Sequence, residues 1–229
     1  RLVLAEARPR LVALPVALLE IEVGAAAAAE AERYRAAGAD DVYVFATSGS
    51  SGRPKRVLLS RRAIAASARF AAERLGTPGA WLLALPAHYV AGFNVISRAV
   101  EMDAPLVAMP DGSFTAAAFA EATALLPAGP RYTSLVPAQL ARLLDDPAGT
   151  AAIASYDRLL LGGQAADVVT VRRAREAGVR LSTTYGMSET SGGCLWDGVP
   201  LGDVEVRLVD GVVHLAGSVL ADGYLDDPE

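Results

Sequence analysis

Short apolar runs alternate with segments of helical periodicity along most of this chain, and this alternation restricts the folds open to it. The runs at residues 42–46 and 81–85 consist entirely of apolar residues, as is typical of strands buried on both faces of a sheet. Helical patterns lie between successive runs, so the sequence predicts the α/β class, with mixed, largely parallel sheets flanked by helices. Similar runs lie at residues 57–59, 106–109, 133–136, 158–161 and 179–182.

The two ends of the chain depart from this pattern. The first 40 residues predict only a strand at 11–15 and a helix at about 25–37. Residues 204–209 alternate between outward and inward side chains with a period of two, and Asp210-Gly211 precedes a second short run at 212–215. An Asp-Gly pair between two such runs is typical of a β-hairpin, so we expect a β-rich segment near the C-terminus.

The composition excludes several classes of protein. With 52% hydrophobic residues, the 229-residue chain can fill a core, so disorder is not expected. The net charge of −5 argues against a nucleic-acid partner, and no apolar run approaches the roughly 18 residues of a membrane span. A single cysteine, Cys194, allows no internal disulfide and predicts a reducing, cytoplasmic compartment.

A segment rich in glycine and serine follows the run at residues 42–46. Glycine N–H groups can converge on an anion, hydroxyl groups donate further hydrogen bonds, and Lys55 adds a positive charge. The segment is not a Walker A loop, because Pro54 precedes the lysine and Arg56 follows it. A surface loop without a ligand is the alternative, but the position after a buried strand favours a phosphate site. The phosphate-binding residues predicted here are Thr47, Ser48, Gly49, Ser50, Ser51, Gly52 and Lys55.

This segment resembles the phosphate-binding loop of the adenylate-forming enzymes, which include acyl-CoA synthetases, firefly luciferase and the adenylation domains of peptide synthetases. Three further segments follow in the order found in that family. Residues 161–165 resemble its glycine turn beside the adenine, and residues 216–224 resemble its Gly-Tyr stretch. The strongest match is at residues 183–190, which read Thr-Thr-Tyr-Gly-Met-Ser-Glu-Thr and resemble the family signature Tyr-Gly-x-Ser/Thr-Glu.

The resemblance implies roles for individual residues. Tyr185 would stack on adenine, Ser188 would donate a hydrogen bond to the α-phosphate, and Glu189 would hold Mg²⁺. The residues expected to take part in the reaction are Lys55, His88, Ser188 and Glu189. The further nucleotide-binding residues implied are Gly162, Gly163, Gln164, Thr184, Gly186 and Met187.

The segment after the run at 81–85 resembles the part of the family that borders the acyl pocket. His88 would hydrogen-bond the substrate carboxylate or gate the pocket, with a purely structural side chain as the alternative. In its details the chain most resembles o-succinylbenzoate–CoA ligases of menaquinone synthesis, whose substrate is an aromatic keto-dicarboxylate. Arg98 would reach toward the second carboxylate, with a solvated or ion-paired helix position as the alternative. The implied substrate-binding residues are His88, Phe93, Asn94, Arg98, Ser191, Gly192 and Gly193.

The implied reaction joins a carboxylic acid to the α-phosphate of ATP, releases pyrophosphate, and then transfers the acyl group to the thiol of coenzyme A. ATP, Mg²⁺, coenzyme A and the acid are therefore the expected small-molecule partners, and the possibility of a homodimer stays open. Three alternatives remain at this point: another acyl- or aryl-CoA ligase, a peptide-synthetase adenylation domain, and a non-catalytic nucleotide-binding remnant.

The resemblance extends over residues from about 40 to 229 and implies a division of the chain. Residues 1–199 would form the α/β core of a large N-terminal domain with the ATP and acyl sites, and residues 200–229 the start of a truncated β subdomain. The Thr-Gly-Asp motif of the family and its small C-terminal domain with a catalytic lysine have no counterpart in the sequence. We therefore expect this chain alone to form the adenylate poorly.

Overall fold

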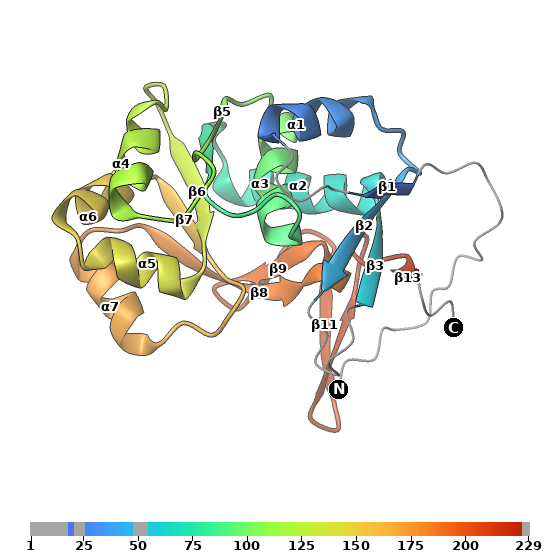
Figure 1. Ribbon diagram of the computed structural model, residues 1–229. Helices are drawn as coiled ribbons and strands as arrows, with labels where there is room; N and C mark the ends of the chain where they lie inside the picture. Colours follow the sequence, from blue (N-terminus) through green and yellow to red (C-terminus); the bar gives the residue numbers. More distant parts are fainter. Residues whose placement is uncertain (1–17, 21–25, 48–54, 226–229) are drawn as a thin grey trace.

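The structure, a computed structural model, describes residues 18–20, 26–47 and 55–225. In this part of the chain, helices flank sheets of seven, four and two strands (Figure 1). The helices are α1 (Ala27–Ala36), α2 (Arg61–Leu75), α3 (Val90–Glu101), α4 (Ala116–Ala124), α5 (Pro137–Leu144), α6 (Pro147–Ala154), α7 (Val168–Glu176) and the 3₁₀ turn η1 (Ser188–Thr190). The strands are β1 (Leu18–Glu20), β2 (Val42–Thr47), β3 (Lys55–Ser60), β4 (Ala80–Leu83), β5 (Leu106–Ala108), β6 (Arg131–Leu135), β7 (Arg158–Leu161), β8 (Leu181–Met187), β9 (Gly192–Trp196), β10 (Val199–Pro200), β11 (Glu205–Val209), β12 (Val212–Ala216) and β13 (Gly223–Tyr224).

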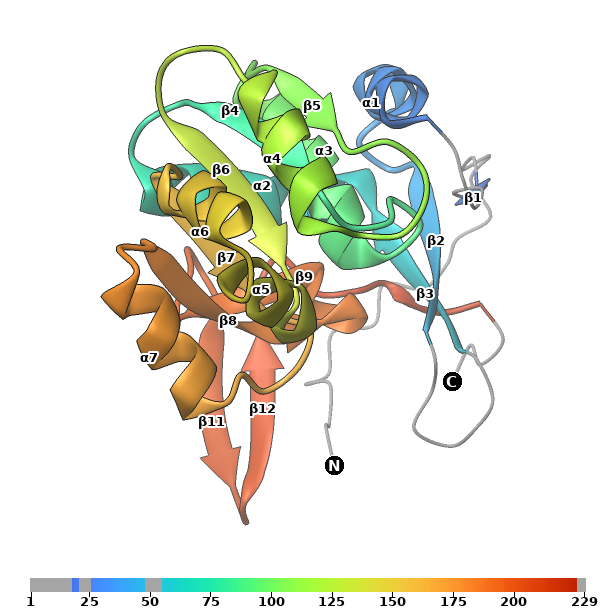
Figure 2. The ribbon, with the colours of Figure 1, turned by 60° about the vertical axis from the view of Figure 1, so that its left-hand side comes forward.

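The seven-stranded sheet has the order β10-β9-β8-β7-β6-β4-β5. Strands β5, β4, β6, β7 and β8 are parallel, whereas β9 and β10 pair antiparallel at one edge. Helices α4, α5 and α6 cover one face of this sheet (Figure 2), and α7 packs there through Ala174. Because both faces are covered, the strands are apolar along their length, as the sequence predicts for the largely parallel α/β class.

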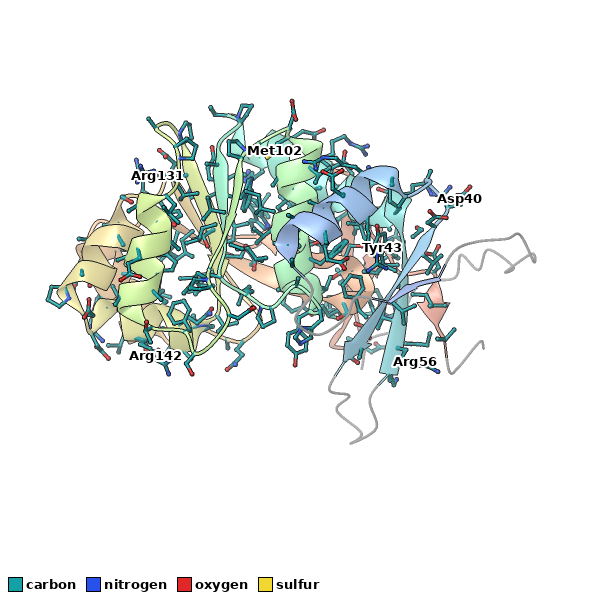
Figure 3. The ribbon with its side chains drawn as sticks, turned by 45° about the horizontal axis from the view of Figure 1, so that its top comes forward. Asp40, Tyr43, Arg56, Met102, Arg131 and Arg142 are labelled. Carbon is teal, nitrogen blue, oxygen red and sulfur yellow. The ribbon has the colours of Figure 1, made fainter. Side chains whose placement is uncertain are left out.

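Helices α2 and α3 cover the other face of the seven-stranded sheet and separate it from the four-stranded sheet (Figure 1). The four-stranded sheet has the order β1-β2-β3-β13, in which only the β1–β2 pair is parallel. Tyr43 of β2 points inward and packs on Phe93 of α3, with ring centroids 4.8 Å apart, while Arg56 of β3 lies on the outer surface (Figure 3). Helix α3 thus packs against both sheets.

The predicted hairpin is confirmed in β11 and β12, which pair from Glu205↔Ala216 to Val209↔Val212. It projects from the body of the molecule (Figure 1), and Asp210 and Gly211 both have positive φ angles in its turn. The segment after residue 200 is nevertheless tied to the core: Leu201, Val204, Leu215 and Val219 are buried in the same cluster as Trp196. The division into units at residues 199 and 200 stays a prediction.

Other local predictions have mixed outcomes. Ser60 caps α2, accepting a hydrogen bond from Ala63 N, and Gly76 ends that helix with a left-handed conformation. The predicted helix at about 25–37 corresponds to α1, whereas the strand predicted at 11–15 lies outside the described residues. Among the described residues, no helix combines the length and the apolar character that a bilayer span requires.

Asp167 gives a pH-dependent test of this fold. It is the N-cap of α7, and hydrogen bonds from the side chain and then the backbone of Thr170 lower the pKa of its carboxyl group. A carboxylate with a lowered pKa stabilises the fold above its unfolded pKa, and this contribution is lost as the pH falls through the folded pKa. We therefore expect Asp167→Ala to lower Tm at neutral pH and to match the unmodified chain once carboxylates are protonated. Glu121→Ala, which removes an exposed carboxylate from α4, is the control and should leave both Tm values nearly unchanged.

Candidate nucleotide and acyl site

A cavity of about 590 Å³ opens where several strands reach their carboxyl ends, beside the N-terminal half of α3. In α/β sheets this edge is the usual place for a ligand, because loops there bring side chains from several strands together. The lining includes the ends of β2, β6, β7 and β8 and the first residues of β9. Segments more than a hundred residues apart in sequence, such as Thr47 and Glu189, therefore share one cavity.

The cavity contains most of the described residues that the sequence analysis assigns to ligands. Ser48, Gly49, Ser50, Ser51 and Gly52 lie outside the described residues, but the strand end that leads into that segment, Thr47, lines the cavity. The other predicted residues among its lining are Asn94, Arg98, Gly162, Gly163, Gln164, Thr184, Gly186, Met187, Ser188, Glu189, Gly192 and Gly193. The predicted nucleotide and acyl residues thus face one space, and their individual roles stay predictions.

Two glycines allow close packing of backbone in this cavity. A Cβ on Gly162 would lie 2.2 Å from Thr184 Oγ1, and Gly163 has φ of +80°, a conformation that favours glycine. A Cβ on Gly186 would lie 1.9 Å from the carbonyl oxygen of Gly192, where β8 and β9 are paired. Side chains at Gly162 and Gly186 would therefore push apart the strands that form the cavity.

Among the described residues, eight buried side-chain polar atoms lack hydrogen-bond partners, and three of these atoms belong to residues that line the cavity. These three are Arg98 Nε, Asn94 Oδ1 and Ser134 Oγ. Buried polar atoms are nearly always satisfied in native proteins, so a group of them around one cavity indicates a polar ligand. Ser134 is absent from the predicted set; the available signal was its hydroxyl near the carboxyl end of a strand, where ligands bind in α/β sheets.

Arg98 is the strongest of these indications. It is 4% exposed, and its guanidinium carbon lies 5.7 Å from the ring centroid of Trp81 and 5.8 Å from that of Trp196. Burial lowers the pKa of Arg98 to about 10, which still leaves the side chain charged at neutral pH. The alternative of a solvated helix position is wrong, and no ion pair to Arg98 is found within the described part of the chain. A buried cation of this kind is costly unless an anion accompanies it.

Glu189 and Ser188 also line the cavity, from the 3₁₀ turn η1. Glu189 Oε1 accepts a hydrogen bond of 2.8 Å from Tyr224 Oη, and Lys55 Nζ lies 4.7 Å from the centroid of the Tyr224 ring. No cluster of three or more metal-ligating side chains occurs in the described ranges. A single carboxylate fits Mg²⁺ that arrives with a nucleotide, because Mg²⁺ keeps several waters and is held by one or two carboxylates together with phosphates.

Two predicted lining residues lie elsewhere. Phe93 is fully buried against Tyr34, Tyr43 and Phe45, on the side of α3 that faces the four-stranded sheet. Ser191 is also fully buried; its hydroxyl donates to Val219 O, and its carbonyl oxygen accepts from Asn94 Nδ2. Both residues support the site from behind, so the expectation that they line the acyl pocket is not met.

His88 also faces away from this cavity. It lines a second cavity of about 530 Å³, together with Met109, Asp111 and Phe114, on the far side of the segment Leu85–Pro86. Its neighbour Tyr89, which the sequence analysis did not select, is 54% exposed and lines the first cavity at the N-terminus of α3. Of these two neighbours, Tyr89 lines the first cavity and His88 does not, and the role predicted for His88 stays a prediction.

Tyr185 and Lys55 lie beside the first cavity but are not among its lining residues. Tyr185 is 47% exposed on β8, so its ring is accessible at the surface for stacking. Lys55 is exposed at the start of β3, opposite Thr47 in the β2–β3 register. The cavity, the exposed tyrosine and the lysine together provide donors for an anion, a flat surface for a ring and one carboxylate for a cation.

Comparisons with known proteins place the chain in a family. The model of the family described as "AMP-binding enzyme" matches residues 6–222. The chain belongs to this family. Its curated relatives include a probable 2-succinylbenzoate–CoA ligase of Mycobacterium tuberculosis, to which it is 46% identical over 188 residues, and the 2-succinylbenzoate–CoA ligase of Escherichia coli, at 31% identity.

These AMP-binding relatives are longer than the chain. The alignments cover 81% of this chain and 49% of the mycobacterial protein, and 78% of this chain and 39% of the Escherichia coli protein. The chain thus spans about half the length of the curated relatives it matches, or less.

Solved structures agree with the family. Escherichia coli MenE with a bound phenylether-linked analogue of OSB-AMS has a TM-score of 0.69 and 28% identity, over 82% of this chain and 41% of that one. MenE from Bacillus subtilis, in complex with the acyl-adenylate intermediate OSB-AMP, has a TM-score of 0.71 and 23% identity, over 83% and 43% of the two chains. The fold is that of the large domain of adenylate-forming enzymes, as the sequence predicts.

Proposed function

We propose that this chain forms the nucleotide- and acyl-binding part of an acid–thiol ligase that activates o-succinylbenzoate with ATP and transfers it to coenzyme A. One observation carries the proposal: the cavity brings the predicted nucleotide residues and the buried, unpaired Arg98 together. The names of the curated relatives and the ligands of the MenE structures support it. A role in menaquinone synthesis, a requirement for Mg²⁺ and a cytoplasmic location belong to the same proposal.

In the first half-reaction, a carboxylate oxygen of the acid forms a bond to the α-phosphorus of ATP, and the bond from that phosphorus to the bridging oxygen breaks. Pyrophosphate leaves with the electron pair of this bond. In the second half-reaction, the sulfur of coenzyme A attacks the acyl carbon, AMP leaves, and the thiol proton is lost to solvent. Such transfers depend chiefly on positioning and on stabilising charge that develops in the transition state.

The residues of this chain would supply that positioning. Gly162, Gly163 and Gln164 would lie against the adenine, and Tyr185 would stack on it from the exposed face. The Ser188 hydroxyl would donate a hydrogen bond to the α-phosphate, and Lys55 would neutralise charge on the phosphates. Glu189 would hold Mg²⁺, which supplies further neutralisation of phosphate charge when bound.

The acid is assigned as a dicarboxylate because of Arg98. One carboxylate of the acid must lie at the α-phosphate, so the anion that meets Arg98 has to be a second group on the same molecule. A benzoate or a simple fatty acid would leave the buried guanidinium without a counter-ion. Arg98 therefore favours a dicarboxylate such as o-succinylbenzoate over the monocarboxylates that other aryl- and acyl-CoA ligases use.

A thermal-shift series on the full chain tests the proposal. We expect OSB-AMS, an adenylate analogue bound in a structure of Escherichia coli MenE, to stabilise the chain more than ATP or o-succinylbenzoate alone. Such an analogue would contact both the predicted nucleotide residues and the predicted acyl residues. At a concentration 100 times Kd, a ligand stabilises by about 2.7 kcal/mol, which raises Tm by roughly 5–10 °C in a domain of this size. An analogue of OSB-AMS that lacks its free carboxylate is the control. The absence of any shift with OSB-AMS would contradict the proposed substrate.

A further inference from the structure

Tyr224 contacts two charged residues of the proposed nucleotide site, the carboxylate of Glu189 and the ammonium group of Lys55. Its hydroxyl donates to Glu189 Oε1 at 2.8 Å, and Lys55 Nζ lies over its ring at 4.7 Å from the centroid. Glu189 is the proposed ligand of Mg²⁺, and Lys55 is the proposed contact to the phosphates. The inference made here rests on that proposed function.

The backbone around Tyr224 connects the elements that carry these two groups. Strand β13 pairs antiparallel with β3, with Tyr224 opposite Val57, and Leu225 N donates to Arg56 O at 2.8 Å. On the preceding side, Ala221 N donates to the carbonyl oxygen of Glu189 at 2.9 Å. The short segment 221–225 is thus hydrogen-bonded both to the strand that begins with Lys55 and to the turn that contains Glu189.

Asp222 adds two further hydrogen bonds between the same segment and the C-terminal half of β3. Its Oδ2 accepts a hydrogen bond of 2.7 Å from Ser60 N, and its own N–H donates to Leu58 O at 2.9 Å. Because backbone and side chain both hold the segment, the Tyr224 side chain starts from a fixed position. A hydroxyl in a fixed position can orient the carboxylate that it contacts.

We propose that Tyr224 is a positioning residue that orients the Glu189 carboxylate for a nucleotide-bound Mg²⁺ and holds the Lys55 ammonium group at the edge of the phosphate site. The hydrogen bond engages Oε1, and Oε2 would be the oxygen left without that contact for the metal. A free glutamate side chain loses rotamer freedom when it binds a cation, which lowers affinity. Because the hydrogen bond from Tyr224 already restricts the Glu189 side chain, less of this entropy is lost on binding. The Tyr224 ring attracts the Lys55 ammonium group and leaves its charge available for phosphate. A direct Lys55–Glu189 ion pair would instead leave neither charge available, Lys55 for phosphate or Glu189 for Mg²⁺.

The two contacts of Tyr224 can be separated by substitution. Tyr224→Phe removes the hydrogen bond to Glu189 and keeps the ring. We expect the affinity of the nucleotide complex for Mg²⁺ to fall about 10-fold, the lower end of the range for loss of a partner of a metal ligand. Affinity for ATP in EDTA should change by less than about twofold, because the ring contact to Lys55 remains. Tyr224→Leu, which removes the ring as well, should also weaken ATP binding in EDTA.

Calorimetric titration of the full chain with ATP, at increasing Mg²⁺ and in EDTA, gives both affinities for each variant. Tyr43→Phe is the matched control, because the Tyr43 hydroxyl is buried in the same sheet and has no hydrogen-bond partner among the described residues. It should leave both affinities unchanged. In a Glu189→Gln background, which already lacks the carboxylate, Tyr224→Phe should cause no further loss of Mg²⁺ dependence.

Several results would overturn the assignment. Equal Mg²⁺ dependence in Tyr224→Phe and the unmodified chain would do so, as would additive losses in the double variant. An equal loss of ATP affinity with and without Mg²⁺ would show that the hydroxyl is merely structural. If the unmodified chain bound no nucleotide under any condition, the proposed function itself would fail, and the positioning role would fail with it.

Discussion

Arg98→Met is expected to abolish tight binding of OSB-AMS while leaving the unliganded fold as stable as before, or more so. The guanidinium is buried beside Trp81 and Trp196 and lines the cavity. Removing one partner of a buried charged pair costs about 2–5 kcal/mol of binding free energy, so Kd should rise roughly 30-fold to several-thousand-fold. Without ligand the charge has no partner among the described residues, and replacing such a charge with an apolar side chain of similar volume is neutral or stabilising.

Two controls distinguish this result from general damage. An analogue of OSB-AMS that lacks only its free carboxylate should bind the unmodified chain and Arg98→Met about equally. Arg61→Met removes a different partly buried arginine, whose Nη2 lies 2.9 Å from Glu101 Oε1. It should lower stability, because it leaves Glu101 without that partner, and it should not change ligand affinity. If Arg98→Met bound OSB-AMS as tightly as the unmodified chain, the second carboxylate would have to lie elsewhere.

Gly186→Ala is expected to produce the largest loss of stability among single-methyl substitutions at the site. The added Cβ would lie 1.9 Å from Gly192 O and 2.7 Å from Gly193 Cα, and both atoms belong to the backbone of β9. Backbone atoms in a paired strand cannot rotate away as a side chain can. Overpacking usually costs 1–3 kcal/mol, so we expect about 3 kcal/mol or more in urea-induced unfolding, or a chain that does not fold.

Gly198→Ala is the matched control for that substitution. Gly198 has φ of +80°, but nothing lies within 4 Å of the position of its Cβ. The substitution tests conformational strain without a clash, and a cost of about 1–2 kcal/mol is expected. Equal stability of Gly186→Ala and the unmodified chain would contradict the close pairing of β8 and β9 on which the cavity depends.

The fold could be predicted from local patterns because each pattern has a direct physical cause. The run at residues 42–46 became β2, the run at 158–161 became β7 in the sheet that helices cover on both faces, and Asp210-Gly211 became a hairpin turn with two positive φ angles. The cavity could be predicted in outline for a similar reason. Segments that follow parallel strands meet at one edge of the sheet, which explains why Gly162 after β7 and Glu189 after β8 share the cavity. Thr47 ends β2 in the separate four-stranded sheet, so its position in the same cavity depends on how the two sheets pack and could be expected only from the family resemblance.

The details of α3 could not be predicted in the same way. Adjacent helical residues point about 100° apart, so one of Phe93 and Asn94 can face the cavity while the other faces the four-stranded sheet. Which one does depends on the four-stranded sheet, whose aromatic side chains Tyr43 and Phe45 receive Phe93. A spacing of four residues places Asn94 and Arg98 on one face, and the structure shows both in the lining.

The direction of the side chains in the turn before α3 depends on the local backbone conformation, which the sequence pattern does not give. His88 and Tyr89 are consecutive, and the sequence alone does not indicate which of them points to the first cavity. In the structure Tyr89 is the N-cap residue of α3 and lines that cavity, while His88 packs on the Tyr89 ring, with centroids 4.3 Å apart, and lines the second one. The residue that lines the first cavity is therefore Tyr89, one position after the histidine that the sequence analysis selected for its chemistry.

A crystal structure of the chain with OSB-AMS is the most direct test of the account. We expect the adenosine half to lie against Gly162–Gln164 and residues 184–189, with the carboxylate that is not joined to the adenosine half within hydrogen-bond distance of the Arg98 guanidinium. Binding in the second cavity beside His88, or in the first cavity with that carboxylate directed away from Arg98, would contradict it.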